Sequence, residues 1–277
     1  MFRQTVAVLM LLTAAGCSSM APGKLADVQT LSDRPRAGNV YLLRGFIGIF
    51  STGIDHLGEE LNADGVRAKV YQDDQWHELA DTIAQRYAGQ ANPEPVVLIG
   101  HSYGADDVIR ISRELEAKNV KVDLLVTIDP VTPPDVPKNV VKCVNIYRPN
   151  GLTDMLPFFR GIPLKADSPE LANVINVNIR TDPRGLMDWD TDHFNIEKKP
   201  KVHAVVLDQV NQTCPDRQIW AALPRMKAQP TATPVMASAE LTSETVSTGK
   251  EHASALHPTT QPQKLSQNSA APGLDGP

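Results

Sequence analysis

Apolar residues alternate along the middle of the chain between short continuous runs and longer stretches with helical spacing. Continuous runs bounded by glycine, proline or asparagine are typical of strands that are buried on both faces. Stretches such as the one carrying Leu79, Ile83 and Tyr87 repeat an apolar side chain every third or fourth residue, which is typical of a helix with one buried side. The predicted strands are residues 39–45, 66–71, 95–99, 122–128, 140–147 and 174–179, and the predicted helices are about 52–62, 76–87, 103–117 and 202–212.

This alternation predicts an α/β fold of three layers, with a mostly parallel central sheet between two layers of helices. In such sheets the ligand binds beyond the carboxyl ends of the strands. Polar residues that directly follow a predicted strand are therefore the first candidates for a functional site.

The first residues do not belong to this pattern. One positive charge precedes the apolar stretch Val6–Ala15, which is too short to cross a bilayer and predicts a signal peptide over residues 1–16. The small residues before Cys17 resemble a bacterial lipobox, which implies lipidation of Cys17, a tether over residues 17–38 and, from Ser18, the periplasmic face of the outer membrane. The alternative is an ordinary secreted protein in which Cys17 is an incidental thiol.

The other end is compositionally distinct. Residues 227–277 lack Phe, Trp and Tyr and are rich in Pro, Ser, Thr and Ala, so they are predicted to be a disordered tail behind a domain at 39–226. Overall, 42% apolar and 21% charged residues exclude a fully disordered chain and a multi-span membrane protein. The net charge of −5 without a basic cluster argues against nucleic acid as a partner.

Two cysteines remain after Cys17. An even number of thiols in an exported chain suggests one disulfide, here between Cys143 and Cys214. It would join a predicted strand to the last predicted helix. Two buried free thiols are the other interpretation, and the sequence alone does not separate the two.

The strongest motif is Gly-His-Ser-Tyr-Gly at residues 100–104, between an apolar strand and a helix. It matches the G-x-S-x-G nucleophile elbow, in which a sharp turn raises the serine into the cleft and the glycines leave room for neighbouring backbone. Ser102 is therefore the candidate nucleophile. The amide of Tyr103, at the start of the helix, is a candidate donor for an oxyanion.

On this motif and its context, residues 39–215 resemble the α/β-hydrolase superfamily, in particular its lipase and esterase branches. The resemblance implies a second oxyanion amide in the turn at residues 43–48, which places it at Phe46, with Ile47 as the neighbour to test next. Arg44 stands where the family usually has histidine. A backbone donor does not depend on that side chain, so the expectation is kept.

A serine nucleophile needs a base, and the base needs an acid to orient it. The superfamily has the order serine, acid, histidine, which leaves His193 in a polar loop and His203 in a helical pattern; His193 is favoured. The other histidines precede Ser102, adjoin it and face away, or lie in the tail: His56, His77, His101, His252 and His257.

The acid has two candidates. Asp129 ends the fourth predicted strand, whereas Asp154 lies seven residues beyond the fifth. We prefer Asp129 because it sits directly at a strand end, and we expect Asp192, next to the histidine, to bond within its loop.

These residues predict a serine hydrolase that cleaves carboxylic esters at the cell envelope, with an acyl ester or lipid as substrate. An envelope acyltransferase with the same triad, or a non-catalytic binding lipoprotein on a hydrolase fold, are the alternatives. The sequence has no metal-ligand spacing and no phosphate-binding loop, so neither a metal nor a cofactor is expected.

Overall fold

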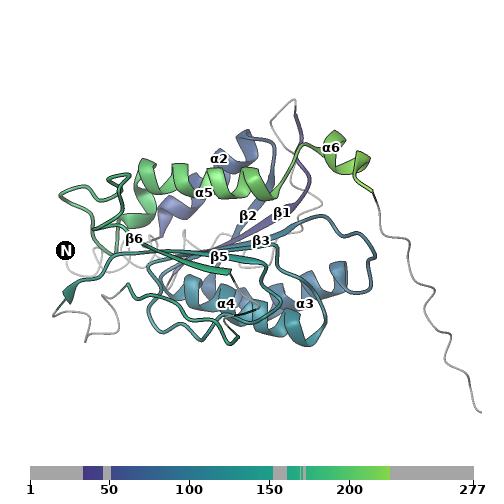
Figure 1. Cartoon of the computed structure of the whole chain (residues 1–277), viewed down its shortest axis with the longest axis horizontal. Helices are drawn as coiled ribbons and strands as arrows, with labels where there is room; N and C mark the ends of the chain where they lie inside the picture. Colours follow the sequence, from purple (N-terminus) through teal and green to yellow (C-terminus); the bar gives the residue numbers. More distant parts are fainter. Residues whose placement is uncertain (1–33, 46–50, 152–160, 169, 171–172, 225–277) are drawn as a thin grey trace, which may run out of the picture. The chain divides into compact units, whose positions relative to one another are not determined.

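The computed structural model describes residues 34–45, 51–151, 161–168, 170 and 173–224. A six-stranded sheet forms its centre, in the order β2-β1-β3-β4-β5-β6 (Figure 1). Every neighbouring pair is parallel, and all six predicted strands are confirmed. The strands are β1 (Asn39–Leu43), β2 (Arg67–Tyr71), β3 (Val96–His101), β4 (Leu124–Ile128), β5 (Lys142–Tyr147) and β6 (Asn173–Asn178).

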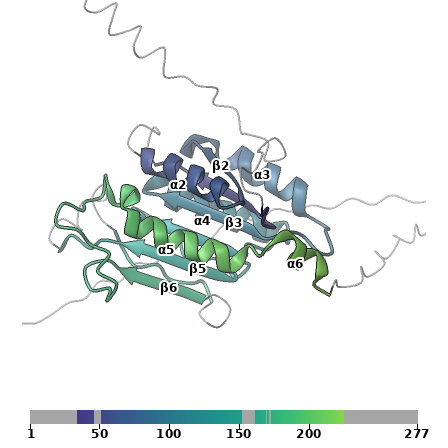
Figure 2. The same ribbon diagram turned by 90° about the horizontal axis from the view of Figure 1, so that it is seen from above.

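Helices cover both faces, which confirms the three-layer α/β fold. Helices α2 and α5 lie on one face and α3 and α4 on the other (Figures 1 and 2). The sequence did not predict α6, a short helix without a buried residue. The bounds are α2 (Thr52–Ala63), α3 (Trp76–Tyr87), α4 (Tyr103–Ala117), α5 (Pro200–Thr213) and α6 (Arg217–Ala222), with 3-10 turns η3 (Asp73–Gln75) and η6 (Ile196–Lys198).

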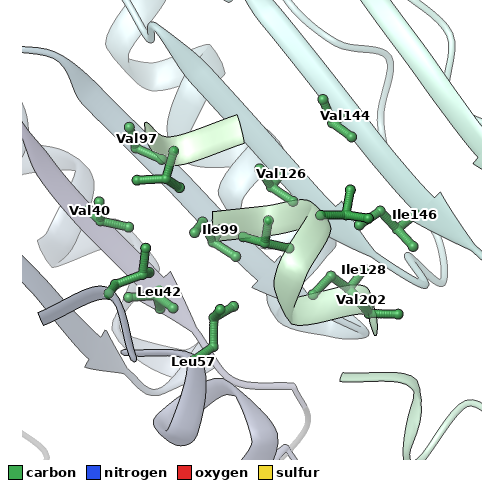
Figure 3. Packing of buried hydrophobic residues seen from close by; sticks show 14 of the residues in the cluster. Val40, Leu42, Leu57, Val97, Ile99, Val126, Ile128, Val144, Ile146 and Val202 are labelled. Atoms are coloured by element: carbon green, nitrogen blue, oxygen red, sulfur yellow. The ribbon is translucent and has the colours of Figure 1, made fainter. Parts of the chain in front are cut away.

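The continuous apolar strands follow from these two layers. In β1, Val40 and Leu42 point toward α2 and α5, where Figure 3 shows them with Leu57 of α2. Tyr41 and Leu43, the alternate residues, pack on the α3 and α4 side. Successive side chains of a strand point to opposite faces, so a strand covered on both faces carries consecutive apolar residues instead of alternating apolar and polar ones.

One part of the α3 and α4 face is covered by a loop instead of a helix. Below β4, β5 and β6 the side chains of Thr127, Asn145 and Asn176 form a hydrogen-bonded row, with Thr127 Oγ1 2.9 Å from Asn145 Oδ1 and Asn145 Nδ2 2.8 Å from Asn176 Oδ1. The row continues to backbone carbonyls of the loop, at Ile162 and Leu164. Polar strand residues here are paired with loop backbone, which lets them be buried.

The folded domain begins earlier than residue 39. Ala37 is fully buried, and its amide donates to the carbonyl of Pro215 at 2.8 Å. Arg36 forms an antiparallel bridge with Asp216, and its side chain donates to the carbonyl of Cys214 at 2.8 Å, at the end of α5. These contacts are made by backbone and a charged side chain, which leave no hydrophobic pattern in the sequence.

Of the two interpretations left open for Cys143 and Cys214, the structure has the second: no disulfide joins them, and both thiols are free and buried. Cys143 belongs to the core on the α3 and α4 face, whereas Cys214 belongs to the core on the α2 and α5 face. The sheet therefore lies between them. Burial raises the pKa of both thiols to about 12.

Other predictions concern segments outside the described residues. These are the signal peptide (1–16), Cys17 and most of the tether, and the tail (227–277). Within the described ranges, no helix combines the length and the apolar character that crossing a membrane requires.

Candidate active site

Ser102 occupies the sharp turn that the motif predicts. It lies between the last residue of β3 and the first of α4, with φ 57° and ψ −124°. A positive φ is rare for a residue with a side chain and costs about 1–3 kcal/mol, so the surroundings must hold it. The amide of Ser102 is bonded to the carbonyl of Ile128 in β4 at 3.0 Å, which ties the turn to the sheet.

The two motif glycines are required by space. A Cβ added to Gly100 would collide with the backbone of Gly104 and lie 2.7 Å from the amide nitrogen of Ala105. A Cβ on Gly104 would lie 2.6 Å from the carbonyl oxygen of Leu43 in β1. The helix that follows the serine thus crosses directly over two strands, which is the steric reason expected from the motif.

The structure brings Ser102, His193 and Asp129 together from three separate segments. Ser102 Oγ lies 2.9 Å from His193 Nε2, and His193 Nδ1 lies 2.7 Å from Asp129 Oδ2. All three residues are buried. Because a carboxylate accepts only, Nδ1 carries the proton, which leaves Nε2 free to accept the proton of the serine.

Asp129 is held on both sides of its carboxylate. It follows β4 with φ 51°, and its Oδ1 accepts the amide of Arg148 at 2.8 Å, while its own amide donates to Ile146 at 2.8 Å. Gly161 packs so closely that a Cβ there would collide with the carboxylate. The other predicted acid, Asp154, lies outside the described residues.

Asp106 supports the turn that carries Asp129, a role that the sequence analysis missed. It is buried in the first turn of α4 and accepts the amides of Val131 at 3.0 Å and Thr132 at 2.8 Å. Burial raises its pKa, and these hydrogen bonds oppose the rise. The available signal was an aspartate in phase with the buried Ile109, on the apolar stripe of the helix.

The loop of His193 is held by its own polar residues. Thr191 Oγ1 accepts the amide of Asp188 at 2.9 Å, and Asn195 Nδ2 donates to the carbonyl of Asp190 at 2.8 Å. Asp192 Oδ1 accepts the amide of Phe194 at 2.8 Å, so this aspartate bonds within the loop as expected. Two further links are the ion pairs Lys199–Asp190 and Lys201–Asp188, both 2.8 Å.

Two aromatic residues of this loop escaped the sequence analysis. Trp189 is 96% exposed and Phe194 is 43% exposed. The ring of Phe194 meets that of His193 edge-on, with centroids 5.4 Å apart. Exposed aromatic surface therefore lies next to His193, the candidate general base.

Of the two predicted oxyanion donors, the structure describes Tyr103 but not Phe46. Tyr103 begins α4, and the first-turn amides of a helix point toward its N-terminus, which is the Ser102 end. Phe46 lies outside the described residues. Its neighbour Gly45 packs on the nucleophile, since a Cβ on Gly45 would lie 2.8 Å from Ser102 Cβ.

Behind the triad lies His101, 1% exposed. Its Nδ1 is 2.8 Å from Ser51 Oγ, and its Nε2 is 2.9 Å from the carbonyl oxygen of His193. Burial, and to a smaller extent repulsion from the neighbouring imidazole of His193, lowers its pKa to about 3. Glu197 approaches it to 3.9 Å, and burial raises the pKa of that carboxyl to about 7.

His203 is packed away from Ser102, as its helical pattern predicts. Its Nδ1 lies 2.7 Å from Glu60 of α2, and its Nε2 lies 2.6 Å from the carbonyl of Glu197. Among the described residues, no group of three or more His, Cys, Asp and Glu could hold a metal ion.

No protein-family model and no curated protein matches the sequence. Among solved structures, an esterase domain of a Rhodothermus marinus protein is 13% identical, with a TM-score of 0.40 over 66% of this chain and 90% of that chain. Aspergillus fumigatus lipase B is 12% identical, with a TM-score of 0.43 over 73% and 56%. The NocB thioesterase domain from the nocardicin cluster is 12% identical, with a TM-score of 0.39 over 64% and 93%.

Proposed function

We propose that this protein is a serine hydrolase that cleaves carboxylic esters, with Ser102 as nucleophile, His193 as base and Asp129 as acid. The observation that carries the proposal is the buried chain of hydrogen bonds from Ser102 Oγ to His193 and on to Asp129, 2.9 and 2.7 Å long. The strained backbone of Ser102 supports it, because strain held in place by the surroundings concentrates at functional sites.

In the first half of the reaction, Ser102 Oγ attacks the ester carbonyl while His193 Nε2 takes the hydroxyl proton. Asp129 stabilises the imidazolium through Nδ1. The tetrahedral intermediate collapses by breaking the bond to the alkoxy oxygen, which leaves as the alcohol with the proton from His193. In the second half a water molecule, deprotonated by the same nitrogen, attacks the acyl-enzyme and releases the acid and Ser102.

The negative charge of each intermediate needs donors on the carbonyl oxygen. The amide of Tyr103 at the start of α4 is one, and we propose the amide of Phe46 as the second. Loss of one such donor typically lowers kcat about 10²–10³-fold.

Labelling with a fluorophosphonate, followed by hydrolysis of p-nitrophenyl esters of increasing chain length, tests the proposal on the protein without its signal peptide. We expect wild type to be labelled at Ser102. We expect the variants Ser102→Ala and His193→Ala not to be labelled and their kcat to be lower than that of wild type by at least about 10⁴-fold. The matched control is Ser112→Ala, which alters a buried serine of α4 whose hydroxyl donates to the carbonyl of Val108 in the same helix.

Folded wild type that neither labels nor hydrolyses any ester would contradict the proposal. Labelling combined with transfer of the acyl group to an added alcohol, in preference to water, would assign the protein to the acyltransferases. The chain length that is cleaved fastest separates an esterase from a lipase.

A further inference from the structure

His101 connects two segments that the proposed reaction must hold in register. On one side Nε2 reaches the backbone carbonyl of His193, at 2.9 Å. On the other side Nδ1 reaches Ser51 Oγ at 2.8 Å, and Ser51 Oγ accepts the amide of Gly45 at 2.9 Å. Gly45 in turn packs against Ser102 Cβ. One side chain therefore bridges the loop of the base and the backbone beside the nucleophile.

The chemistry of the partners determines where each proton lies. A carbonyl oxygen only accepts, so Nε2 of His101 carries a proton and donates it to His193. A neutral ring then has Nδ1 as an acceptor, which takes the hydroxyl proton of Ser51. The same hydroxyl oxygen accepts from Gly45, so all three hydrogen bonds run in one direction, from Gly45 to His193.

The surroundings keep this ring neutral. His101 is 1% exposed, and burial, together with repulsion from the neighbouring imidazole of His193, lowers its pKa to about 3, against the opposing effect of the hydrogen bond to the His193 carbonyl. The cation of Lys198 also lowers this pKa. Glu197, at 3.9 Å from Nε2, is beyond hydrogen-bond distance, and the rings of His101 and His193 lie 5.3 Å apart.

We propose that His101 is a positioning residue that fixes the backbone of His193 relative to Ser102, by bridging the His193 carbonyl and the Ser51–Gly45 pair. This inference rests on the proposed hydrolase function. His101 touches no reacting atom, and its contribution is to hold the base within transfer distance of Ser102 Oγ.

Three substitutions separate the two sides of the bridge. His101→Leu removes both hydrogen bonds, and we expect kcat to fall about 100-fold with KM within about twofold, because a displacement near 1 Å has that effect on rate. His101→Gln extends an amide donor to the position of Nε2, and we expect it to recover kcat to within about tenfold of wild type. The side chain of His101→Asn reaches only Ser51, and we expect the kcat of this variant to be as low as that of His101→Leu.

Ser51→Ala tests the coupling between the two sides. It lowers kcat in wild type and has a smaller effect in the His101→Leu background, where the bond between Ser51 and His101 is already lost and only the bond from Gly45 remains to be broken. His203→Gln is the matched control, since His203 is also buried and also bonds a backbone carbonyl, that of Glu197, without contact to the triad. It is expected to lower the melting temperature and leave kcat unchanged.

Equal kcat in wild type and His101→Leu, or losses that simply follow the melting temperature of each variant including His203→Gln, would overturn the proposal. Nitrogen-15 NMR of the imidazoles decides it without catalysis: His101 is expected as a neutral Nε2–H ring that does not titrate between pH 8 and 5. Titration near pH 6.5 would overturn the bridge even in an inactive protein. Absence of ester hydrolysis in wild type with a non-titrating His101 would instead contradict the proposed function.

Discussion

Asp129 uses its two carboxylate oxygens for different partners, the ring of His193 and the amide of Arg148. An asparagine at this position can keep only one of them as an acceptor. Its amide group would donate to Nδ1 of His193, which moves the proton of the ring to Nε2 and prevents that nitrogen from accepting the serine proton.

We therefore expect Asp129→Asn to lower kcat about 10⁴-fold with little change in KM. Steady-state hydrolysis of a p-nitrophenyl ester measures it, and Asp154→Asn is the comparison. A large loss in the Asp154 variant together with an active Asp129 variant would transfer the role of the acid to Asp154.

Glu197 is fully buried near the candidate site, and we expect its charge to affect stability. Burial raises the pKa of its carboxyl to about 7, against the nearby charge of Lys198. The folded protein therefore binds this proton more tightly than the unfolded chain does, so the contribution to stability is complete below the unfolded pKa near 4.3 and is lost as the pH rises through 7.

Glu197→Gln should remove this pH dependence. At pH 8 we expect the variant to be about 1–3 kcal/mol more stable than wild type, or several degrees higher in melting temperature, whereas at pH 5 the two differ little. Thermal unfolding at both pH values measures the effect. A wild-type stability that does not fall relative to the variant between pH 5 and 8 would contradict it.

At the scale of elements, the sequence predicts most strands and helices because the sheet is covered on both faces. In β3, for example, Val96–Ile99 are consecutive apolar residues, and the motif that carries Ser102 follows them directly. The features that were missed have no apolar signal. Arg36 joins the domain through hydrogen bonds to backbone carbonyls. Helix α6 has no buried residue, so its sequence shows no helical repeat of apolar positions.

The candidate site was predictable to a similar degree. Ser102, His193 and Asp129 follow predicted strands or stand in a polar loop, where chemistry is expected in such a fold. His101 and Asp106 act through segments distant in sequence, the His193 loop and the turn after β4. Only the three-dimensional arrangement brings those partners together, so their supporting contacts could not be derived from spacing.

The close contact between α4 and β1 at Gly104 predicts that no side chain is tolerated at this position. Gly104→Ala would place a Cβ 2.6 Å from the carbonyl of Leu43, and neither backbone can move without disturbing Ser102. We expect a loss of at least about 2 kcal/mol in the free energy of unfolding, together with loss of activity. Gly58→Ala in α2 is the control, because its Cβ meets side-chain methyls, of Val70 at 3.0 Å and of Leu42 at 3.9 Å, and no backbone, and because alanine favours a helix. Denaturant unfolding of both variants measures the difference, and equal stabilities would contradict the steric argument.

At the scale of the whole molecule, the free thiols predict that a reductant does not change the stability of the protein. Cys143 and Cys214 lie on opposite faces of the sheet. We expect the protein without residues 1–17, unfolded in the absence of reductant, to be alkylated at both thiols, and its melting temperature to be unchanged by dithiothreitol. A mass without alkylation until reductant is added would restore the disulfide.

The lipid anchor is a second prediction at this scale, and it rests on the sequence around Cys17. When the full chain is expressed in a Gram-negative host, we expect it to partition into the detergent phase of Triton X-114 and the Cys17→Ser variant to partition into the aqueous phase. Equal partitioning of the two would favour an ordinary secreted protein.

The bridge between Arg36 and Asp216 has a consequence for how the domain can be attached to anything else. It lies where β1 begins, at the amino ends of the parallel strands. Ser102 and Asp129 follow β3 and β4, at the carboxyl ends of the strands. A strand of six residues is about 20 Å long. An anchor, a fusion partner or a solid support joined at either end of the domain would thus be attached on the side opposite Ser102, which would leave the candidate active site pointing away from the attachment.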